Sequence, residues 1–287
     1  MQRVLKDLVD LLALERLDRD LFRGTSQDLG WGAIFGGQVL GQALSAAAQT
    51  VTPDRPVHSL HGYFIRAGAM TQPIVYEVDR LRDGKSFSTR RVVAIQEGEA
   101  IFSLEASFQT EEAGFDHQDA MPDVPSPDEL RSERDIALQF AAMLPSHVRT
   151  MATAERPIEI RPVDLRNPLA PKAHAPSRKL WYRAIDKLPD DPALHRYLLA
   201  YASDFSFLGT ALDPHGVSWL TPGMQVASLD HAMWFHRPFR VDDWLLYAVD
   251  SPSAAGARGL VRGQFFDRQG RLVASAMQEG LIRRRPG

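Results

Sequence analysis

Two long apolar segments with helical spacing divide the chain, and each comes before a series of short strand-like segments. In residues 35–51, "FGGQVLGQALSAAAQTV", apolar side chains recur at helical positions such as Val39, Leu40 and Ala43, and no residue is charged. This spacing is typical of a helix, and the lack of charge indicates burial on most sides. The second segment, residues 193–212, is "ALHRYLLAYASDFSFLGTAL". We predict one helix from each.

Apolar runs rich in β-branched and aromatic residues predict the strands around these helices. In the first half these runs span residues 16–24, 59–65, 73–81, 88–96 and 100–109, and in the second half residues 158–165, 178–185, 226–235, 244–250, 258–266 and 271–280. Each half is therefore expected to be one long helix with an antiparallel sheet of about five or six strands, because a curved sheet must bury one face and a central helix can fill it.

The halves also resemble each other in sequence. "SLHGYFIRAG" and "SLDHAMWFHRPF" each place a His before two large side chains and an Arg, which aligns His61 with His231 at an offset of 170 residues. The offset becomes 171 for "VYEVD" and "LYAVD", and 172 where Gly98 aligns with Gly270. A slowly drifting offset indicates a duplicated unit with small loop insertions. We therefore predict an α+β fold of two repeats.

The predicted boundaries follow from this repeat. Residues 1–111 form the first repeat, residues 112–156 a linker and residues 157–287 the second repeat. The linker is acidic and Pro-rich at its start, which favours a path over the surface, and "IALQFAAMLPSHV" within it can form a helix. The start of the chain, "MQRVLKDLVDLLALERLD", is interrupted by charge and predicts an amphipathic helix rather than a signal peptide.

Composition narrows the class of protein. The chain is 44% hydrophobic and 24% charged, as soluble globular proteins are. A formal net charge of −3 gives no electrostatic reason to expect a nucleic-acid partner. The absence of cysteine excludes disulfides, thiolate metal sites and a Cys nucleophile. No apolar run is long enough to span a bilayer, so we expect a cytoplasmic protein without membrane insertion.

Standard catalytic motifs are missing. "GGQVLGQA" lacks the Lys-Ser/Thr of a phosphate loop, so its glycines are expected to allow close helix packing, or to offer backbone N–H groups to a carbonyl. No G-x-S-x-G is present. His58 and His61 fall on opposite faces of a strand, which makes joint metal binding unfavourable. The adjacent Asp230 and His231 also point opposite ways, and His61 and His231 are interpreted as core histidines.

One carboxylate in the second half suggests chemistry. Asp204 lies in "YLLAYASDFSFLG", where an apolar helix makes a charge costly unless it is paired or used. The alternative is a helix cap or a partly exposed position. By the local offsets, Ser228 corresponds to His58 and Gln278 to Ala106, so the second repeat has a hydroxyl and an amide that the first lacks. Together the three residues could hold one water, with Asp204 as general base.

The chain resembles the acyl-CoA thioesterase II family, of TesB type. The resemblance runs nearly end to end through "LFRG", "FGGQVLGQAL", "VHSLHGYFIR", "RDGKSFSTRRVVAIQ", "IFSLEASFQ", "AGFDHQ", "YASDF", "LDHAMWFHRPF", "ARGLVRGQFFDRQGRLVAS" and "QEG". It implies a double hotdog fold and hydrolysis of acyl-CoA to free acid and CoA, without metal or other cofactor. The family's water-holding Asp, Thr or Ser, and Gln fall on Asp204, Ser228 and Gln278. Thr is usual at the middle position, so Ser228 departs from the pattern.

Further expectations accompany this resemblance. The acyl chain would lie in an apolar channel between sheet and helix, and the CoA phosphates would meet Lys85, Arg90, Arg91 or Arg258. Asp230 would have a structural or supporting role. The resemblance also implies a homodimer or homotetramer, because hotdog sheets commonly join edge to edge. Two alternatives stay open: a hotdog hydratase or dehydratase, which would want a His facing the substrate, and a non-catalytic acyl-CoA binding or sensing protein.

Overall fold

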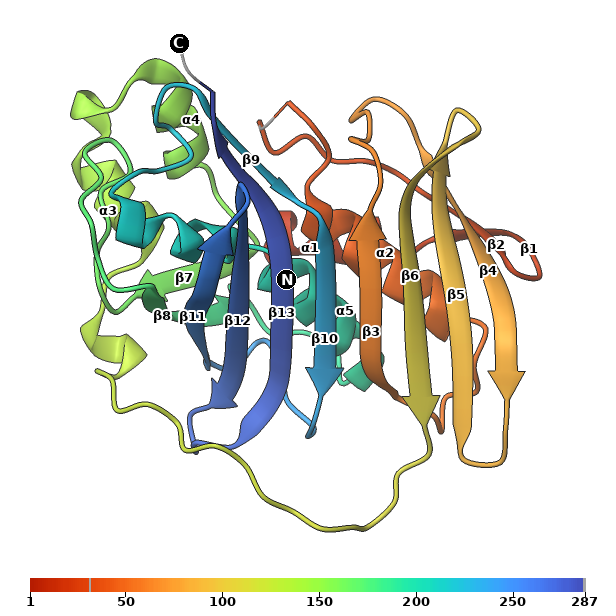
Figure 1. Ribbon diagram of the computed structural model, residues 1–287. Helices are drawn as coiled ribbons and strands as arrows, with labels where there is room; N and C mark the ends of the chain where they lie inside the picture. Colours follow the sequence, from red (N-terminus) through yellow and green to blue (C-terminus); the bar gives the residue numbers. More distant parts are fainter. Residues whose placement is uncertain (31, 286–287) are drawn as a thin grey trace.

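A computed structural model describes residues 1–30 and 32–285. One antiparallel sheet runs through the molecule in the order β1-β2-β4-β5-β6-β3-β10-β13-β12-β11-β8-β7, and β9 pairs with β13 outside this path (Figure 1). The strands of the first half are β1 (Glu15–Asp18), β2 (Leu21–Gly24), β3 (Val57–Phe64), β4 (Ile74–Asp83), β5 (Phe87–Gln96) and β6 (Glu99–Gln109). Those of the second half are β7 (Ile158–Pro162), β8 (Ser177–Ala184), β9 (Met224–Ser228), β10 (Asp230–Phe235), β11 (Leu245–Ala255), β12 (Arg258–Asp267) and β13 (Leu272–Arg284).

The strand order shows the duplication. Read from either end of the sheet, each half runs through two outer strands, three long ones and a last strand that pairs with its counterpart, β3 with β10. The aligned sequence segments fall on β3 and β10, β4 and β11, and β6 and β13. The predicted α+β fold of two repeats is therefore confirmed.

The residue alignment on β3 and β10 needs a correction. Gly62 is paired with Leu104 of β6 and Met233 with Ala276 of β13, which makes the offset 171 at this point. His231 then corresponds to Leu60, and both are fully buried. His61 instead faces outward beside the ring of Trp234. The interpretation of His61 as a core histidine is therefore wrong, and that of His231 as a buried one is right.

Two helices pack side by side against the inner face of the sheet. They are α2 (Gly36–Ala48) and α5 (Pro192–Ser203), and they contact each other across the two repeats (Figure 1). Gly37 makes this contact possible, because a Cβ there would lie 2.3 Å from the carbonyl oxygen of Tyr201. The expectation that these glycines serve close packing is thus met. The N-terminal α1 (Arg3–Leu12) buries Leu5 and Leu8 under the same core.

The second helix is shorter than its apolar pattern predicts. α5 begins at Pro192, with the Asp191 side chain accepting from the N–H of Ala193, and ends at Ser203. Asp204 is its C-cap, and the left-handed Ser206, with φ of 57°, turns the chain away. Two 3₁₀ turns follow, η3 (Leu208–Ala211) and η4 (Asp213–His215). The prediction of one helix over residues 193–212 is wrong for residues 204–212, nearly half of its length.

Three further predictions of continuous elements are also wrong. The strand over residues 16–24 is broken at residues 19–20, between β1 and β2. The strand over residues 226–235 breaks at Leu229, where β9 ends and β10 begins. The N-terminal helix ends at Leu12, and residues 15–18 form β1 instead.

The connection between the repeats is fastened to the second one. Gln118 hydrogen-bonds the backbone of Gly270 and Leu272, and Trp181 donates its ring N–H to the Pro125 carbonyl. This segment covers a small apolar cluster on the outer face of the sheet, away from the helices. It continues into η1 (Pro127–Glu129), α3 (Glu133–Gln139), η2 (Ala141–Met143) and α4 (Ser146–Thr153), so the apolar run at 136–148 is split into short helices.

Candidate active site

Asp204, Ser228 and Gln278 lie together at the junction of the two central helices. Nε2 of Gln278 is 2.8 Å from Oδ1 of Asp204 and 3.0 Å from Oγ of Ser228. The three residues come from the end of α5, the end of β9 and the middle of β13, so they are separated by tens of residues in the sequence. The fold therefore brings together the three side chains selected from the sequence.

The environment of Asp204 is apolar and partly electropositive. Its side chain is only 7% exposed, and Oδ2 accepts the backbone N–H of Gly37 at 3.0 Å. That N–H belongs to the first turn of α2, where unpaired donors and the helix dipole favour an anion. The first repeat thus completes a site whose side chains all belong to the second.

Burial sets the protonation of this carboxyl. Desolvation raises the pKa of Asp204 above its ordinary value, and hydrogen bonds from Gln278, Gly37 and Ser228 oppose the rise. A carboxylate with a raised pKa is a stronger base once it is ionised. The arrangement suits a group that must accept a proton from water.

His231, predicted from the sequence to be a core histidine, lies directly behind the amide of Gln278. Its Nδ1 is 3.2 Å from Gln278 Nε2, and its Nε2 is 2.9 Å from Oγ of Ser203. The ring is fully buried, and burial lowers its pKa to about 3. His231 therefore stays neutral at ordinary pH.

The equivalent region of the first repeat cannot hold a water in the same way. With the corrected offset on β3, the counterparts of Ser228 and His231 are Val57 and Leu60, and Ala106 corresponds to Gln278. The comparison of Ser228 with His58 is therefore one residue out. Its conclusion survives, because the first repeat has an apolar side chain at each of these positions.

The basic residues expected near CoA phosphates occupy different surroundings. Arg90 is 1% exposed, and its guanidinium donates to Thr50, Asp83 and the carbonyls of residues 50, 82 and 89. This burial speaks against a phosphate contact, because a saturated buried guanidinium has no surface to offer. Arg91 is exposed and pairs with Asp79.

Lys85 and Arg258 lie at matching hairpins of the two repeats, β4–β5 and β11–β12. Lys85 is exposed in the turn between β4 and β5. Arg258 begins β12, pairs with Glu279, and borders a groove of about 350 Å³ near the end of β13.

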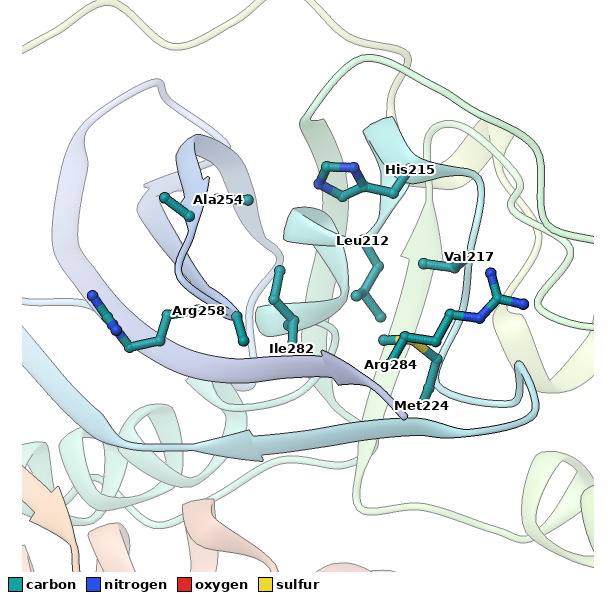
Figure 2. Close-up of a pocket in the computed structure, with 10 residues that line it drawn as sticks. Leu212, His215, Val217, Met224, Ala254, Arg258, Ile282 and Arg284 are labelled. Atoms are coloured by element: carbon teal, nitrogen blue, oxygen red, sulfur yellow. The ribbon is translucent and has the colours of Figure 1, made fainter. Parts of the chain in front are cut away.

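Apolar side chains line the floor of this groove, among them Leu212, Met224 and Ile282, and Arg258 and Arg284 lie on either side of Ile282 (Figure 2). Its walls include β9 and β13, the two strands that carry Ser228 and Gln278.

Asp230 supports the middle of β13, next to Gln278. Its Oδ1 accepts the backbone N–H of Glu279. Asp230 and His231 are adjacent in β10, so their side chains lie on opposite faces of this strand. Within residues 1–30 and 32–285, no three His, Asp or Glu side chains gather as metal ligands would. In the same part of the chain no helix is long and apolar enough to cross a membrane.

The fold defines a class, the two-repeat hotdog proteins. A protein from Alicyclobacillus acidocaldarius described as having a hot dog fold superposes over 98% of this chain and 99% of its own, with a TM-score of 0.76 and 20% identity. At that identity the match concerns the fold alone. It confirms the predicted hotdog architecture.

Sequence comparisons identify the family. Residues 25–109 match the model of the acyl-CoA thioesterase N-terminal domain, and residues 147–281 match the acyl-CoA thioesterase model. Acyl-CoA thioesterase 2 of Haemophilus influenzae is 44% identical over 99% of both chains. The structure of an acyl-CoA thioesterase II, TesB2, from Mycobacterium marinum is 45% identical, covers 98% of this chain and 99% of its own, and gives a TM-score of 0.78. The chain belongs to the TesB-type acyl-CoA thioesterase II family, and the prediction of a thioester hydrolase is confirmed.

Proposed function

We propose that the chain hydrolyses acyl-CoA to free acid and CoA with one water activated by Asp204. The observation that carries this proposal is the convergence of a buried carboxylate, a hydroxyl and an amide from three distant segments. Asp204 takes a proton from the water, while Ser228 and Gln278 fix its orientation. The water oxygen bonds to the thioester carbon, the C–S bond breaks, and the thiolate of CoA leaves with the electron pair.

The developing oxyanion needs a hydrogen-bond donor. The amide protons of Gln278 face Asp204, Ser228 and His231, so they are engaged by the protein. The start of α2 is then the better source, since the helix begins at Gly36, close to the carboxyl of Asp204, and the helix dipole favours negative charge there. The acyl chain is proposed to lie in the apolar space between sheet and helices.

The trio can be tested by the release of free thiol from acyl-CoAs of graded chain length. The protein contains no cysteine, so every thiol detected comes from CoA. We expect Ser228→Ala and Gln278→Ala to lower kcat by about tenfold to a hundredfold because each loses a side chain that positions Asp204 or the water. Full turnover by both folded variants would remove the trio from the mechanism. Binding of acyl-CoA by the wild type without turnover would favour the sensing alternative.

The hydratase alternative has less support. It requires a His open to substrate, and His231 is fully buried, with both ring nitrogens within hydrogen-bond distance of Gln278 or Ser203.

We further propose that the CoA phosphates contact Arg258. Ile282, on the groove floor, follows Gln278 by four residues, which is about 13 Å along β13. Lys85 lies in the turn between β4 and β5, and Arg91 lies in β5, which is four strand-to-strand steps from β13. They are weaker candidates, and Arg90 is left out.

Acyl-pantetheine, which lacks the nucleotide phosphates, separates this contact from the chemistry. Arg258→Ala is expected to raise KM for acyl-CoA several-fold and to leave KM for acyl-pantetheine unchanged, because an exposed charge–phosphate contact contributes about 1 kcal/mol. Arg262→Ala is the matched control, since Arg262 is on the same strand, similarly exposed and also ion-paired, with Asp250. Equal effects of the two substitutions on both substrates would exclude Arg258, and the same comparison with Lys85→Ala and Arg91→Ala tests those residues.

Assembly, location and boundaries complete the proposal. We propose a homodimer or homotetramer in the cytoplasm, with repeats at residues 1–111 and 157–287 and a linker at residues 112–156. The short strands β1 and β7 leave an open edge at each end of the sheet, which is the kind of surface through which sheets associate. Light scattering coupled to gel filtration would measure the mass, and a monomer of 32.0 kDa would contradict the proposed assembly.

A further inference from the structure

The amide nitrogen of Gln278 has three potential hydrogen-bond acceptors nearby but only two protons. Its Nε2 lies within hydrogen-bond distance of Asp204, Ser228 and His231, at 2.8, 3.0 and 3.2 Å. An amide nitrogen carries two protons. Ser228 itself hydrogen-bonds Asp204, so one N–H can be shared by that pair while the second points to His231.

The oxygen of the same amide is an orphan. Oε1 of Gln278 is buried and has no hydrogen-bond partner among the described residues, although the whole side chain is 0% exposed. An unpaired buried acceptor is costly, and in native proteins it calls for a specific explanation. A water that donates one hydrogen to Asp204 and the other to Oε1 would satisfy it and keep its lone pairs free to attack.

Ser203 determines which nitrogen of His231 carries the proton. The Ser203 hydroxyl donates to the carbonyl of Ala200 at 2.8 Å, so its oxygen is left to accept from Nε2 of His231 at 2.9 Å. The imidazole is therefore the Nε2–H tautomer, and Nδ1 presents a lone pair. That lone pair accepts an N–H from Gln278 and would repel its oxygen.

We propose that His231 is a positioning residue that fixes which way the amide of Gln278 faces. It holds the NH₂ group toward Asp204 and leaves Oε1 for the reacting water. The proposal rests on the hydrolytic role given above for the trio.

The contact from His231 to the Gln278 amide becomes necessary during turnover. While Asp204 is ionised, its oxygen is by itself sufficient to keep the NH₂ group of Gln278 in place. Once Asp204 has taken the proton of the water, it can donate to Oε1, and the amide could rotate by half a turn. The lone pair of His231 opposes that rotation throughout the cycle, since burial keeps the ring neutral.

Nitrogen NMR of histidine-labelled protein tests the tautomer without any substrate. Nine histidines give signals, and the set lost in His231→Asn belongs to position 231. We expect one neutral tautomer, protonated at Nε2, from pH 8 down to about pH 4.5. A ring protonated at Nδ1 would overturn the proposal, because it would require a flipped amide. This result does not depend on whether the wild type hydrolyses acyl-CoA, so it separates this inference from the function on which it rests.

Kinetics separate positioning from packing. His231→Leu removes the acceptor at similar volume, and we expect kcat to fall by about tenfold to a hundredfold with KM nearly unchanged. His231→Asn returns an oxygen near the place of Nδ1 and should recover most of kcat. Equal losses in both folded variants would contradict positioning.

Ser203→Ala serves if the Leu variant does not fold. It should let the Nδ1–H tautomer of His231 appear and lower kcat several-fold. A single unchanged tautomer would overturn the role of Ser203, and with it the proposal that His231 fixes the orientation of the Gln278 amide.

Discussion

Substitution of Gly36 tests how closely the first repeat is fitted to the carboxylate of the second. A Cβ at this position would lie 2.8 Å from Oδ2 of Asp204 and 3.0 Å from two ring carbons of Phe64, where ordinary contacts begin at 3.4 Å. In Gly36→Ala the carboxylate must therefore retreat by about half an ångström from its place beside the Gly37 N–H. Displacements of this order cost a catalytic group up to about a hundredfold in rate, so we expect kcat to fall by tenfold to a hundredfold.

The stability of the same variant should change much less. Overpacking costs about 1–3 kcal/mol, and replacing a helical Gly by Ala recovers up to about 1 kcal/mol, so the free energy of unfolding should fall by about 0–3 kcal/mol. Thiol release measures the rate, and urea unfolding measures the stability. Gly41→Ala is the control on the same helix, since its Cβ meets the flexible end of Leu12 at 3.0 Å and the Tyr197 carbonyl at 3.1 Å. A folded Gly36→Ala as active as Gly41→Ala would refute the fitted site.

Three further results follow from the site. Because burial raises the pKa of Asp204, kcat/KM should decrease as pH falls through an apparent pKa above 3.8. A value of kcat/KM that stays constant down to pH 4 would show that another group is the base. The raised pKa also means that the protonated Asp204 stabilises the folded wild type below pH 3.8 and that this stability is lost as pH rises. Asp204→Asn should therefore be the more stable protein at pH 8, by about 1.4 kcal/mol for each pH unit between the folded and unfolded pKa values of Asp204. If thermal melts gave Asp204→Asn a smaller advantage at pH 8 than at pH 4, the pKa of Asp204 would not be raised by folding. Ser228→Thr keeps the hydroxyl and adds a methyl that stiffens the side chain, so its kcat should match or exceed that of the wild type, and a loss as large as that of Ser228→Ala would show that the hydroxyl is not what matters.

The large features of the fold follow from patterns visible in the sequence. Repeated motifs at a nearly constant offset predict the two repeats, and alternating apolar positions predict most strands. Asp204 is recognisable because a charge is rare in so apolar a helix. Ser228 and Gln278 emerge from the comparison of the repeats, although the alignment near His58 is out by one residue.

Other features depend on contacts that one segment does not encode. The segment of residues 193–212 keeps its apolar spacing past Ser203, yet α5 ends there and the chain turns, which places Asp204 against the start of α2. A break at Leu229 and a register shift between Val57 and Ser59 change which side chains face inward, so His61 lies outside and His231 inside. The contact between His231 and Gln278 joins two strands far apart in sequence, and only the folded sheet shows it.

The central claim is that Asp204 activates the water, and one comparison tests it most directly. Thiol release from an acyl-CoA is measured for the wild type, Asp204→Asn and Asp230→Asn. Asp230 is the matched control, because it is also a partly buried carboxyl with a raised pKa whose main contact, the N–H of Glu279, an Asn oxygen can keep. We predict that Asp204→Asn loses on the order of a hundredfold or more in kcat while Asp230→Asn stays within a few-fold of the wild type. Turnover that survives in folded Asp204→Asn would contradict the claim and place the base elsewhere.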